Sequence, residues 1–249
     1  MNGYKLLALD MDGTLLNRKH AISADNRKWI HRAIDSGITV MLATGRESQS
    51  IKPYVEELGL TSPIVCVNGS EVWQAPDQLM RRHVLKTEWV AELYSLSKEY
   101  DCRYWAYTVD EVFTKERWLE RIDPQDGRQW LKFGIHCDNP GRLAEIRAIL
   151  AAAGRYELSN SSASNIEVNP AGISKASGIR DICKLLGIGM AEVAACGDSL
   201  NDLEMIRSVG LGIAMGNAQE TVKQAAKAVT GTNEEDGVAQ AIRTYLLPD

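Results

Sequence analysis

The whole chain is organised around one segment near its N-terminus, Leu6-Leu7-Ala8-Leu9-Asp10-Met11-Asp12-Gly13-Thr14-Leu15. Its apolar half is typical of a strand buried on both faces of a parallel sheet, a pattern that a buried helical segment shares. Two carboxylates, Asp10 and Asp12, follow, and Gly13 supplies a turn. Open α/β sheets bind ligands at the carboxyl edge of their strands. We interpret the segment as a strand that ends in functional carboxylates, although a solvated turn or part of a calcium loop also fits these acids alone.

The chain has 249 residues, a net charge of −5 and five scattered cysteines. Its length suffices for one large domain or two smaller ones without disulfides. The cysteines form no metal-binding or redox pattern, so reduced thiols are expected. No apolar run has the length of a membrane span, and Asp10 comes too early for a signal peptide before it. We expect a soluble cytoplasmic protein, a monomer or weak homodimer, with no membrane or nucleic-acid partner.

Strands and helices alternate in both outer parts of the chain. Apolar strands are predicted at residues 38–43, 64–67, 193–196 and 210–214, and residues with helical spacing follow the first, third and fourth of these. Pro53 is expected to limit how early the helix after the second strand starts. Repeated strand–helix units of this kind predict an α/β fold whose core domain contains a Rossmann-like parallel sheet.

The pattern changes between residues 84 and 165. Strand-like runs occur at residues 103–109, 111–114 and 130–136, and helices are predicted around residues 89–98 and 143–153. Such an arrangement is typical of an α+β layer. We therefore predict a discontinuous core domain, residues 1–83 and 166–249, with an inserted α+β cap domain at residues 84–165.

Four short motifs lie at the ends of predicted strands or at the start of a predicted helix, all outside the insertion. In chain order they are Asp10-Met11-Asp12-Gly13-Thr14-Leu15, Ala43-Thr44-Gly45-Arg46, Gly172-Ile173-Ser174-Lys175-Ala176 and Gly197-Asp198-Ser199-Leu200-Asn201-Asp202. Together they resemble the four motifs of the haloacid dehalogenase (HAD) superfamily, most of whose members are phosphatases. The insertion between the second and third motifs resembles that of the type II, Cof-like branch.

The resemblance implies a phosphoric monoester hydrolase that acts through an aspartyl phosphate. By position, Asp10 would be the nucleophile and Asp12 the general acid and base, with Thr44 and Lys175 completing the catalytic set. A Mg²⁺ cofactor would be held by the Asp10 carboxylate, the Asp12 backbone carbonyl and Asp198. These roles agree with what phosphoryl transfer requires, namely an in-line nucleophile, neutralisation of charge on the phosphoryl oxygens and a proton for the leaving group.

The same resemblance implies substrate contacts by Thr44, Lys175 and Asn201. Gly45 and Arg46 are added as substrate-binding candidates because they follow Thr44 directly. Asp202 would orient Lys175, and the cap would choose the leaving group. Taken alone, Thr44 is more typical of a helix cap and Lys175 of an exposed residue. A cation early in a helix nevertheless opposes the helix macrodipole unless an anion lies beside it, which favours a functional role for Lys175.

The expected function is therefore Mg²⁺-dependent hydrolysis of a small phosphorylated metabolite such as a sugar phosphate. A sugar phosphomutase and a non-catalytic sugar-phosphate sensor stay open as alternatives. A halide-releasing enzyme is less favoured, because it has no use for a proton donor at Asp12 or for Mg²⁺. The four histidines (His20, His31, His83 and His136) match no metal spacing and are interpreted as structural or exposed.

Overall fold

The chain folds into two compact units in the computed structural model, which describes residues 3–119 and 121–248. Unit 1, the core unit, comprises residues 1–81 and 174–249, and unit 2, the inserted unit, comprises residues 82–173. The predicted boundary at 165/166 therefore needs correction. Residues 166–173 belong to the inserted unit, because the strand Asn165–Pro170 pairs there with two neighbours, Trp130–His136 and Tyr156–Ser159.

The core unit is built on a sheet in the order β13-β12-β11-β1-β2-β3-β4-β5. Its strands are β1 (Leu6–Leu9), β2 (Thr39–Ala43), β3 (Ile64–Cys66), β4 (Glu71–Ala75), β5 (Gln78–Arg82), β11 (Val193–Gly197), β12 (Leu211–Ala214) and β13 (Ala228–Val229). Neighbours from β13 to β3 pair in parallel, and β4 runs antiparallel to β3. The predicted parallel sheet is confirmed, whereas the β4–β5 hairpin was not predicted.

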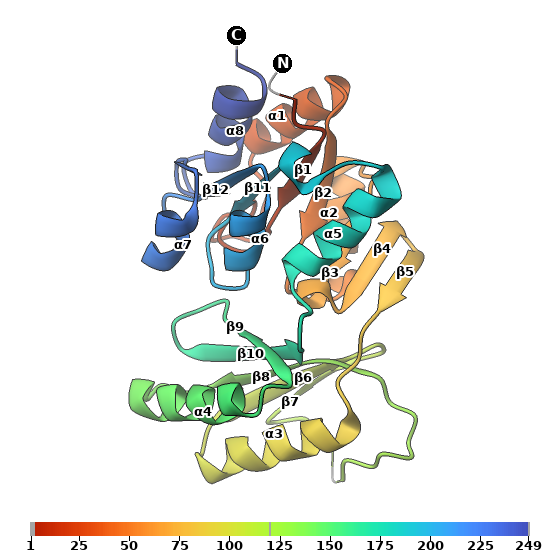
Figure 1. Cartoon of the computed structure of the whole chain (residues 1–249), viewed down its shortest axis with the longest axis vertical. Coiled ribbons are helices and arrows are strands. Elements are labelled where there is room, and N and C mark those ends of the chain that lie inside the picture. The colour runs from red at the N-terminus through yellow and green to blue at the C-terminus, as the bar shows by residue number, and fades with distance from the viewer. Residues whose placement is uncertain (1–2, 120, 249) are drawn as a thin grey trace. The chain divides into compact units, whose positions relative to one another are not determined.

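Strand β1 lies in the middle of this sheet (Figure 1). It pairs with β2 on one side and with β11 on the other, so that Leu9 lies between Leu42 and Cys196. All four of its side chains are fully buried, as expected for a strand covered on both faces. The residue after β1 therefore leaves the sheet between the ends of two neighbouring strands.

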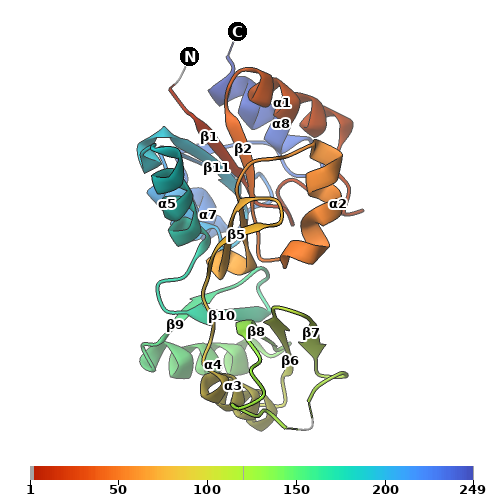
Figure 2. The same cartoon turned by 90° about the vertical axis from the view of Figure 1, so that its right-hand side faces the viewer.

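Helices cover both faces of the core sheet, with α1, α2 and α8 on one face and α5, α6 and α7 on the other (Figure 2). Their bounds are α1 (Ala24–Asp35), α2 (Ser48–Leu58), α5 (Lys175–Leu186), α6 (Leu203–Ser208), α7 (Glu220–Ala225) and α8 (Gly237–Ala241), which continues as a π-helical turn over Ile242–Leu246. Pro53 lies inside α2, so the prediction that it limits the helix start is wrong. Its missing N–H removes one helical hydrogen bond, which the helix tolerates.

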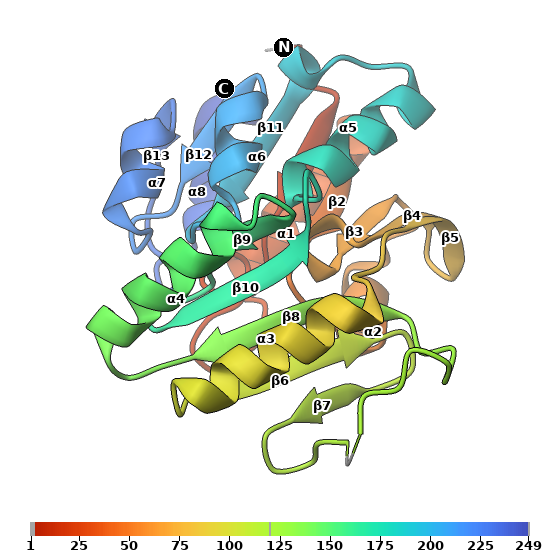
Figure 3. The ribbon, with the colours of Figure 1, turned by 60° about the horizontal axis from the view of Figure 1, so that its bottom comes forward.

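The inserted unit has a five-stranded antiparallel sheet in the order β7-β6-β8-β10-β9, with α3 and α4 on one face (Figure 3). Its elements are α3 (Thr87–Glu99), β6 (Arg103–Thr108), β7 (Val112–Thr114), β8 (Trp130–His136), α4 (Pro140–Ala152), β9 (Tyr156–Ser159) and β10 (Asn165–Pro170). Side chains such as Phe133, Ile135 and Ile166 form a separate core beneath the helices. The unit thus has the α+β layer that its sequence predicted.

Two expectations from composition can be compared with the structure. All five cysteines are buried free thiols, as expected. Over residues 3–119 and 121–248, no helix is long and apolar enough to cross a membrane.

Candidate active site

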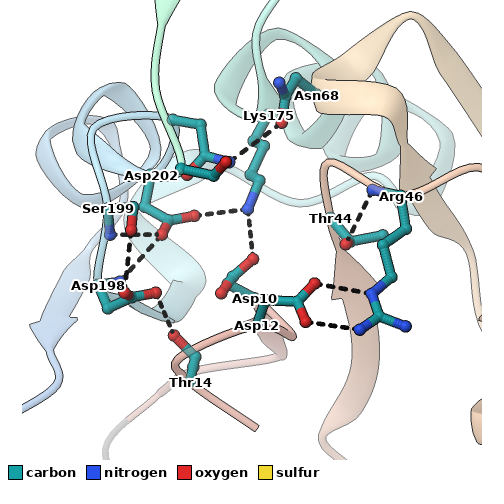
Figure 4. Close-up of polar contacts among 12 residues, drawn as sticks. Asp10, Asp12, Thr14, Thr44, Arg46, Asn68, Lys175, Asp198, Ser199 and Asp202 are labelled. Atoms are coloured by element: carbon teal, nitrogen blue, oxygen red, sulfur yellow. Dashed lines mark hydrogen bonds and ion pairs between the residues drawn. The ribbon is translucent and has the colours of Figure 1, made fainter. Parts of the chain in front are cut away.

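The predicted site residues of the core unit meet at the carboxyl edge of its sheet (Figure 4). Asp10 follows β1, Thr44 follows β2, and Asp198 follows β11. Lys175 is the first residue of α5, which begins at an N-cap formed by Ser174. Parallel strands end at the same edge, so motifs that are far apart in the sequence are brought together here.

Lys175 is the buried centre of this site. Its Nζ lies 2.5 Å from Asp10 Oδ1 and 2.7 Å from Asp202 Oδ1, and its side chain is fully buried. Burial opposes the charge of the ammonium group, but the two carboxylates outweigh this effect and raise the pKa of Lys175. Lys175 is therefore a cation, and the expectation that it is an exposed helix residue when considered alone does not hold.

Asp202 holds Lys175 in place. One of its carboxylate oxygens accepts from Lys175, while the other accepts from the backbone N–H groups of Asp198 and Ser199, at 2.9 and 3.1 Å. The Asp202 side chain is completely buried. With both oxygens engaged in this way, Asp202 ties the start of α5 to the turn after β11.

Three carboxylates, those of Asp10, Asp198 and Asp202, lie close enough to share a cation, each with an oxygen within 4.8 Å of the others. Burial, followed by the charge of Asp202, raises the pKa of Asp10 well above its usual range. The same two causes raise the pKa of Asp198 to about 6. So much buried negative charge is stable only when it is paired with protons or cations.

The residues at this edge fit a magnesium ion. Asp10 Oδ2 is buried and has no hydrogen-bond partner among the described residues, so one carboxylate oxygen of Asp10 is left uncompensated. Carboxylate oxygens are the ligands that Mg²⁺ prefers, typically one or two from protein together with a phosphate oxygen. The Asp202 oxygens accept from the Lys175 ammonium group and from two backbone N–H groups, whereas those of Asp198 accept from two hydroxyl groups. Asp10 and Asp198 are therefore the better side-chain candidates.

Asp198 is oriented by the first motif as well as by its own. Thr14 Oγ1 donates to Asp198 Oδ1 at 3.3 Å, and Ser199 Oγ donates to Asp198 Oδ2 at 2.9 Å. The Asp198 carbonyl also accepts from Gln219 N at 2.8 Å. Thr14 and Ser199 were not among the predicted site residues, although both lie inside the motifs.

Gly13 allows this approach between the two motifs. Its φ is +82°, and a Cβ atom built there would lie 2.5 Å from Asp198 Oδ2. We expect Gly13→Ala to raise the Mg²⁺ concentration needed for half-maximal activity by at least about tenfold, because Asp198 must move. Gly59→Ala is the matched control, since Gly59 has a φ of +62° but no atom within 4 Å of such a Cβ. An equal shift in both variants would attribute the effect to backbone strain alone.

Asp12 lies in a different environment from Asp10. Its side chain is 47% exposed, and both of its oxygens accept from Arg46, at 2.7 Å from Nε and 2.6 Å from Nη2. Burial opposes its ionisation, but the hydrogen bonds and charge of Arg46 outweigh this and lower the pKa of Asp12. Arg46 was expected to bind substrate, whereas in the structure its guanidinium group is engaged by Asp12.

The other predicted phosphate-binding residues lie around the same edge. Thr44 is buried, and its hydroxyl accepts from Arg46 N at 3.2 Å, which leaves the hydroxyl proton available for donation. Gly45 lies between them in the turn. Asn201 donates through Nδ2 to Asn68 Oδ1 at 3.3 Å, while its own Oδ1 is buried without a hydrogen-bond partner among the described residues.

His20 is the one histidine near these residues in the described part of the core unit. It is exposed, as expected, but its Nδ1 lies 3.3 Å from Arg46 Nη2 and 3.7 Å from Asp12 Oδ1. Tyr54 donates to the His20 carbonyl at 3.0 Å. His20 and Tyr54 stand in no motif, so the sequence carried no signal for their place beside Arg46.

Comparison with protein families places the site in context. The model of the family described as haloacid dehalogenase-like hydrolase matches residues 7–242. The chain is also 42% identical over 243 residues to the 5-amino-6-(5-phospho-D-ribitylamino)uracil phosphatase YcsE of Bacillus subtilis, covering 98% of this chain and 96% of that protein. A second phosphatase named for the same substrate, YitU of B. subtilis, is 32% identical over 262 residues, covering 97% of both chains.

A solved structure agrees with the fold. A haloacid dehalogenase-like hydrolase from B. subtilis superposes with a TM-score of 0.89 at 26% identity, covering 97% of this chain and 99% of that one. The likeness therefore extends through both units and is not confined to the four motifs.

Proposed function

The chain belongs to the haloacid dehalogenase-like hydrolases and is a Cof-like phosphatase, and we propose that it hydrolyses phosphate monoesters through an aspartyl phosphate on Asp10 with Mg²⁺ as its cofactor. The observation that carries this proposal is the buried arrangement of Lys175, Asp10 and Asp202, with one Asp10 oxygen left unpartnered. A nucleophilic carboxylate that is fixed at one oxygen and free at the other suits in-line attack.

In the first half-reaction, a carboxylate oxygen of Asp10 attacks phosphorus. A bond from Asp10 to phosphorus forms while the bond from phosphorus to the leaving oxygen breaks, and Asp12 gives its proton to that oxygen. Lys175 offsets the charge of Asp10, and the Thr44 hydroxyl donates to a phosphoryl oxygen. The product is an alcohol together with a phosphorylated Asp10.

In the second half-reaction, water replaces the alcohol. Asp12, now ionised, takes a proton from the water as its oxygen attacks phosphorus, and the bond between phosphorus and Asp10 breaks. Inorganic phosphate leaves and Asp10 regains its carboxylate. Arg46 lowers the pKa of Asp12 and so keeps it ionised, as this second step requires. Asp12 must take up a proton before it can act as the acid of the first half-reaction.

Asp10, Asp198 and the Asp12 carbonyl are the proposed ligands of Mg²⁺. When bound, the cation neutralises charge on the phosphoryl group and aligns it with the nucleophile. We expect Asp198→Asn to raise the half-saturating Mg²⁺ concentration by about 10²-fold or more, since loss of even a supporting group costs metal sites 10–100-fold. Phosphate release measured against Mg²⁺, with calorimetric Mg²⁺ titration, checks this. An unchanged Mg²⁺ dependence would remove Asp198 from the ligand set.

The proposed substrate is a small polyhydroxylated phosphate ester. The names of two relatives make 5-amino-6-(5-phospho-D-ribitylamino)uracil, a phosphorylated sugar alcohol joined to a base, the first compound to test. The inserted unit, which holds none of the Asp10, Thr44, Lys175 and Asp198 positions, is the proposed selector of the leaving group. Fold alone does not fix the substrate of such enzymes.

The test is phosphate release from this compound, from several sugar phosphates and from pyridoxal phosphate, each with Mg²⁺ and with a chelator. We expect Mg²⁺-dependent release, with the highest kcat/KM for the ribitylamino compound. Conversion of a sugar phosphate into its isomer would instead indicate a phosphomutase. Binding without phosphate release from any compound would contradict the hydrolase and indicate a sensor.

A further inference from the structure

We propose that Arg46 is a positioning residue, which acts by holding the carboxylate of Asp12 in a fixed orientation rather than by binding the substrate. The inference rests on the proposed role of Asp12 in proton transfer. Both units of the chain contain other ion pairs. The pair of Arg46 and Asp12 differs from them because it joins the proposed general acid and base to an arginine that could otherwise bind the substrate phosphate (Figure 4).

Arg46 and Asp12 form a bidentate ion pair. Arg46 Nε and Nη2 donate to the two separate oxygens of Asp12, at 2.7 and 2.6 Å. Two parallel hydrogen bonds of this kind fix the plane of a carboxylate as well as its position. A single ammonium group would fix neither so well, because it acts as a point charge.

Arg46 is itself held from several sides. Its N–H donates to Thr44 Oγ1 at 3.2 Å, and its carbonyl accepts from Val67 N at 2.9 Å. The Tyr54 ring centroid lies 5.6 Å from the guanidinium carbon, and His20 Nδ1 lies 3.3 Å from Nη2. The guanidinium group is thus placed by the turn after β2, by α2 and by the loop before α1, and not by Asp12 alone.

Stability does not account for this arrangement. The Asp12 side chain is 47% exposed and that of Arg46 is 23% exposed, and ion pairs as open to water as this contribute little to folding. Without Arg46, an Asp side chain so exposed would change rotamer freely. It would then spend less time in the orientation needed for proton transfer. The charge of Asp10, by contrast, is offset by Lys175, so the nucleophile does not need Arg46.

A double-mutant cycle separates positioning from substrate binding. The variants are Arg46→Ala, Asp12→Ala and the double variant. Arg46→Ala is assayed with an alkyl phosphate from the test panel, and the complete cycle is measured as turnover of acetyl phosphate, which Asp12→Ala should still hydrolyse slowly. We expect Arg46→Ala to lower kcat by about 10²-fold, the usual scale for a misplaced catalytic group, with KM changed by less than about threefold. If Arg46 acts only through Asp12, the double variant should be no slower than Asp12→Ala, because there is nothing left to position.

Acetyl phosphate supplies a second readout, because acetate leaves without needing an acid. Arg46→Ala should therefore phosphorylate Asp10 from acetyl phosphate at the wild-type rate, yet hydrolyse the phosphoenzyme slowly, since that step needs the base. Arg46→Lys should stay closer to Arg46→Ala than to wild type, because it lacks the fork. Arg27→Ala, which removes a surface pair with Glu57, is the matched control and should behave as wild type.

Several results would overturn the proposal. A multiplicative loss in the double variant, a raised KM with unchanged kcat, or slow phosphorylation by acetyl phosphate would each assign Arg46 to the substrate phosphate. Full activity of Arg46→Lys would show that charge alone suffices. If wild-type protein released no phosphate from any ester, the proposed function would fall and this inference with it. If the wild-type protein releases phosphate normally and the variants give any of the contradicting results above, only the positioning role of Arg46 is rejected.

Discussion

Asp10→Asn is expected to reduce phosphate release by about 10⁴-fold or more, as loss of a catalytic nucleophile does in other enzymes. The amide preserves the shape of the side chain but cannot attack phosphorus effectively or form the aspartyl phosphate. The fold should survive, because burial and the neighbouring Asp202 raise the pKa of Asp10 and so disfavour its charge in the folded state. The melting temperature should therefore change little, even though Lys175 loses one of its two carboxylate partners.

The measurement pairs steady-state phosphate release with a thermal unfolding curve for each variant. Asp35→Asn serves as the control. Asp35 is an exposed residue of α1, and its substitution removes the same negative charge at a position away from the site. Activity of Asp10→Asn near that of the control would reject Asp10 as the nucleophile. A large fall in melting temperature would show instead that the charge of Asp10 is needed for folding.

Asp12→Ala is expected to accumulate phosphoenzyme from acetyl phosphate. The leaving acetate needs no proton, so Asp10 should still be phosphorylated, but hydrolysis should slow by roughly 10² to 10⁴-fold without the general base. With an alkyl phosphate, loss of the acid should block the first step, and no burst of product should appear. The two substrate classes should thus reveal two different slow steps in one variant.

Rapid mixing of Asp12→Ala with acetyl phosphate and Mg²⁺, followed by intact-mass spectrometry and peptide mapping, checks this expectation. One added phosphoryl group should be found on the peptide that carries Asp10. Wild-type hydrolysis by the variant would contradict the division of labour between the two carboxylates. Phosphorylation of any other residue would reject the proposed intermediate.

The sequence predicted those parts of the fold that repeat a simple physical pattern. Strand β1 is four buried apolar residues, and β11 is equally apolar, so both were found. The β4–β5 hairpin was missed because Glu71–Ala75 and Gln78–Arg82 mix polar and apolar residues and contain no continuous apolar run. The end of the inserted unit was misplaced because Asn165–Pro170 follows the same strand pattern whichever sheet it joins.

The sequence predicted those residues of the candidate site that belong to the four motifs. Asp10, Asp198 and Lys175 meet as expected because parallel strands end at one edge. The contact between Arg46 and Asp12 could not be predicted, since a sequence does not say which way an arginine after a strand turns. His20 is a similar case, because its place depends on a left-handed backbone, with φ of 54°, and on the Tyr54 hydroxyl.

The pairing of β1 with β11 has a consequence for how the protein is made. A ribosome delivers Asp10 before the inserted unit and Asp198 only after that unit has been completed. Until β11 emerges, one edge of β1 lacks its native partner, and such edges invite association with other chains. The inserted unit is contiguous, whereas the proposed active site can form only after β11 has been made. A nascent chain that stops before β11 would therefore carry Asp10, the proposed nucleophile, without Asp198 and the rest of its site.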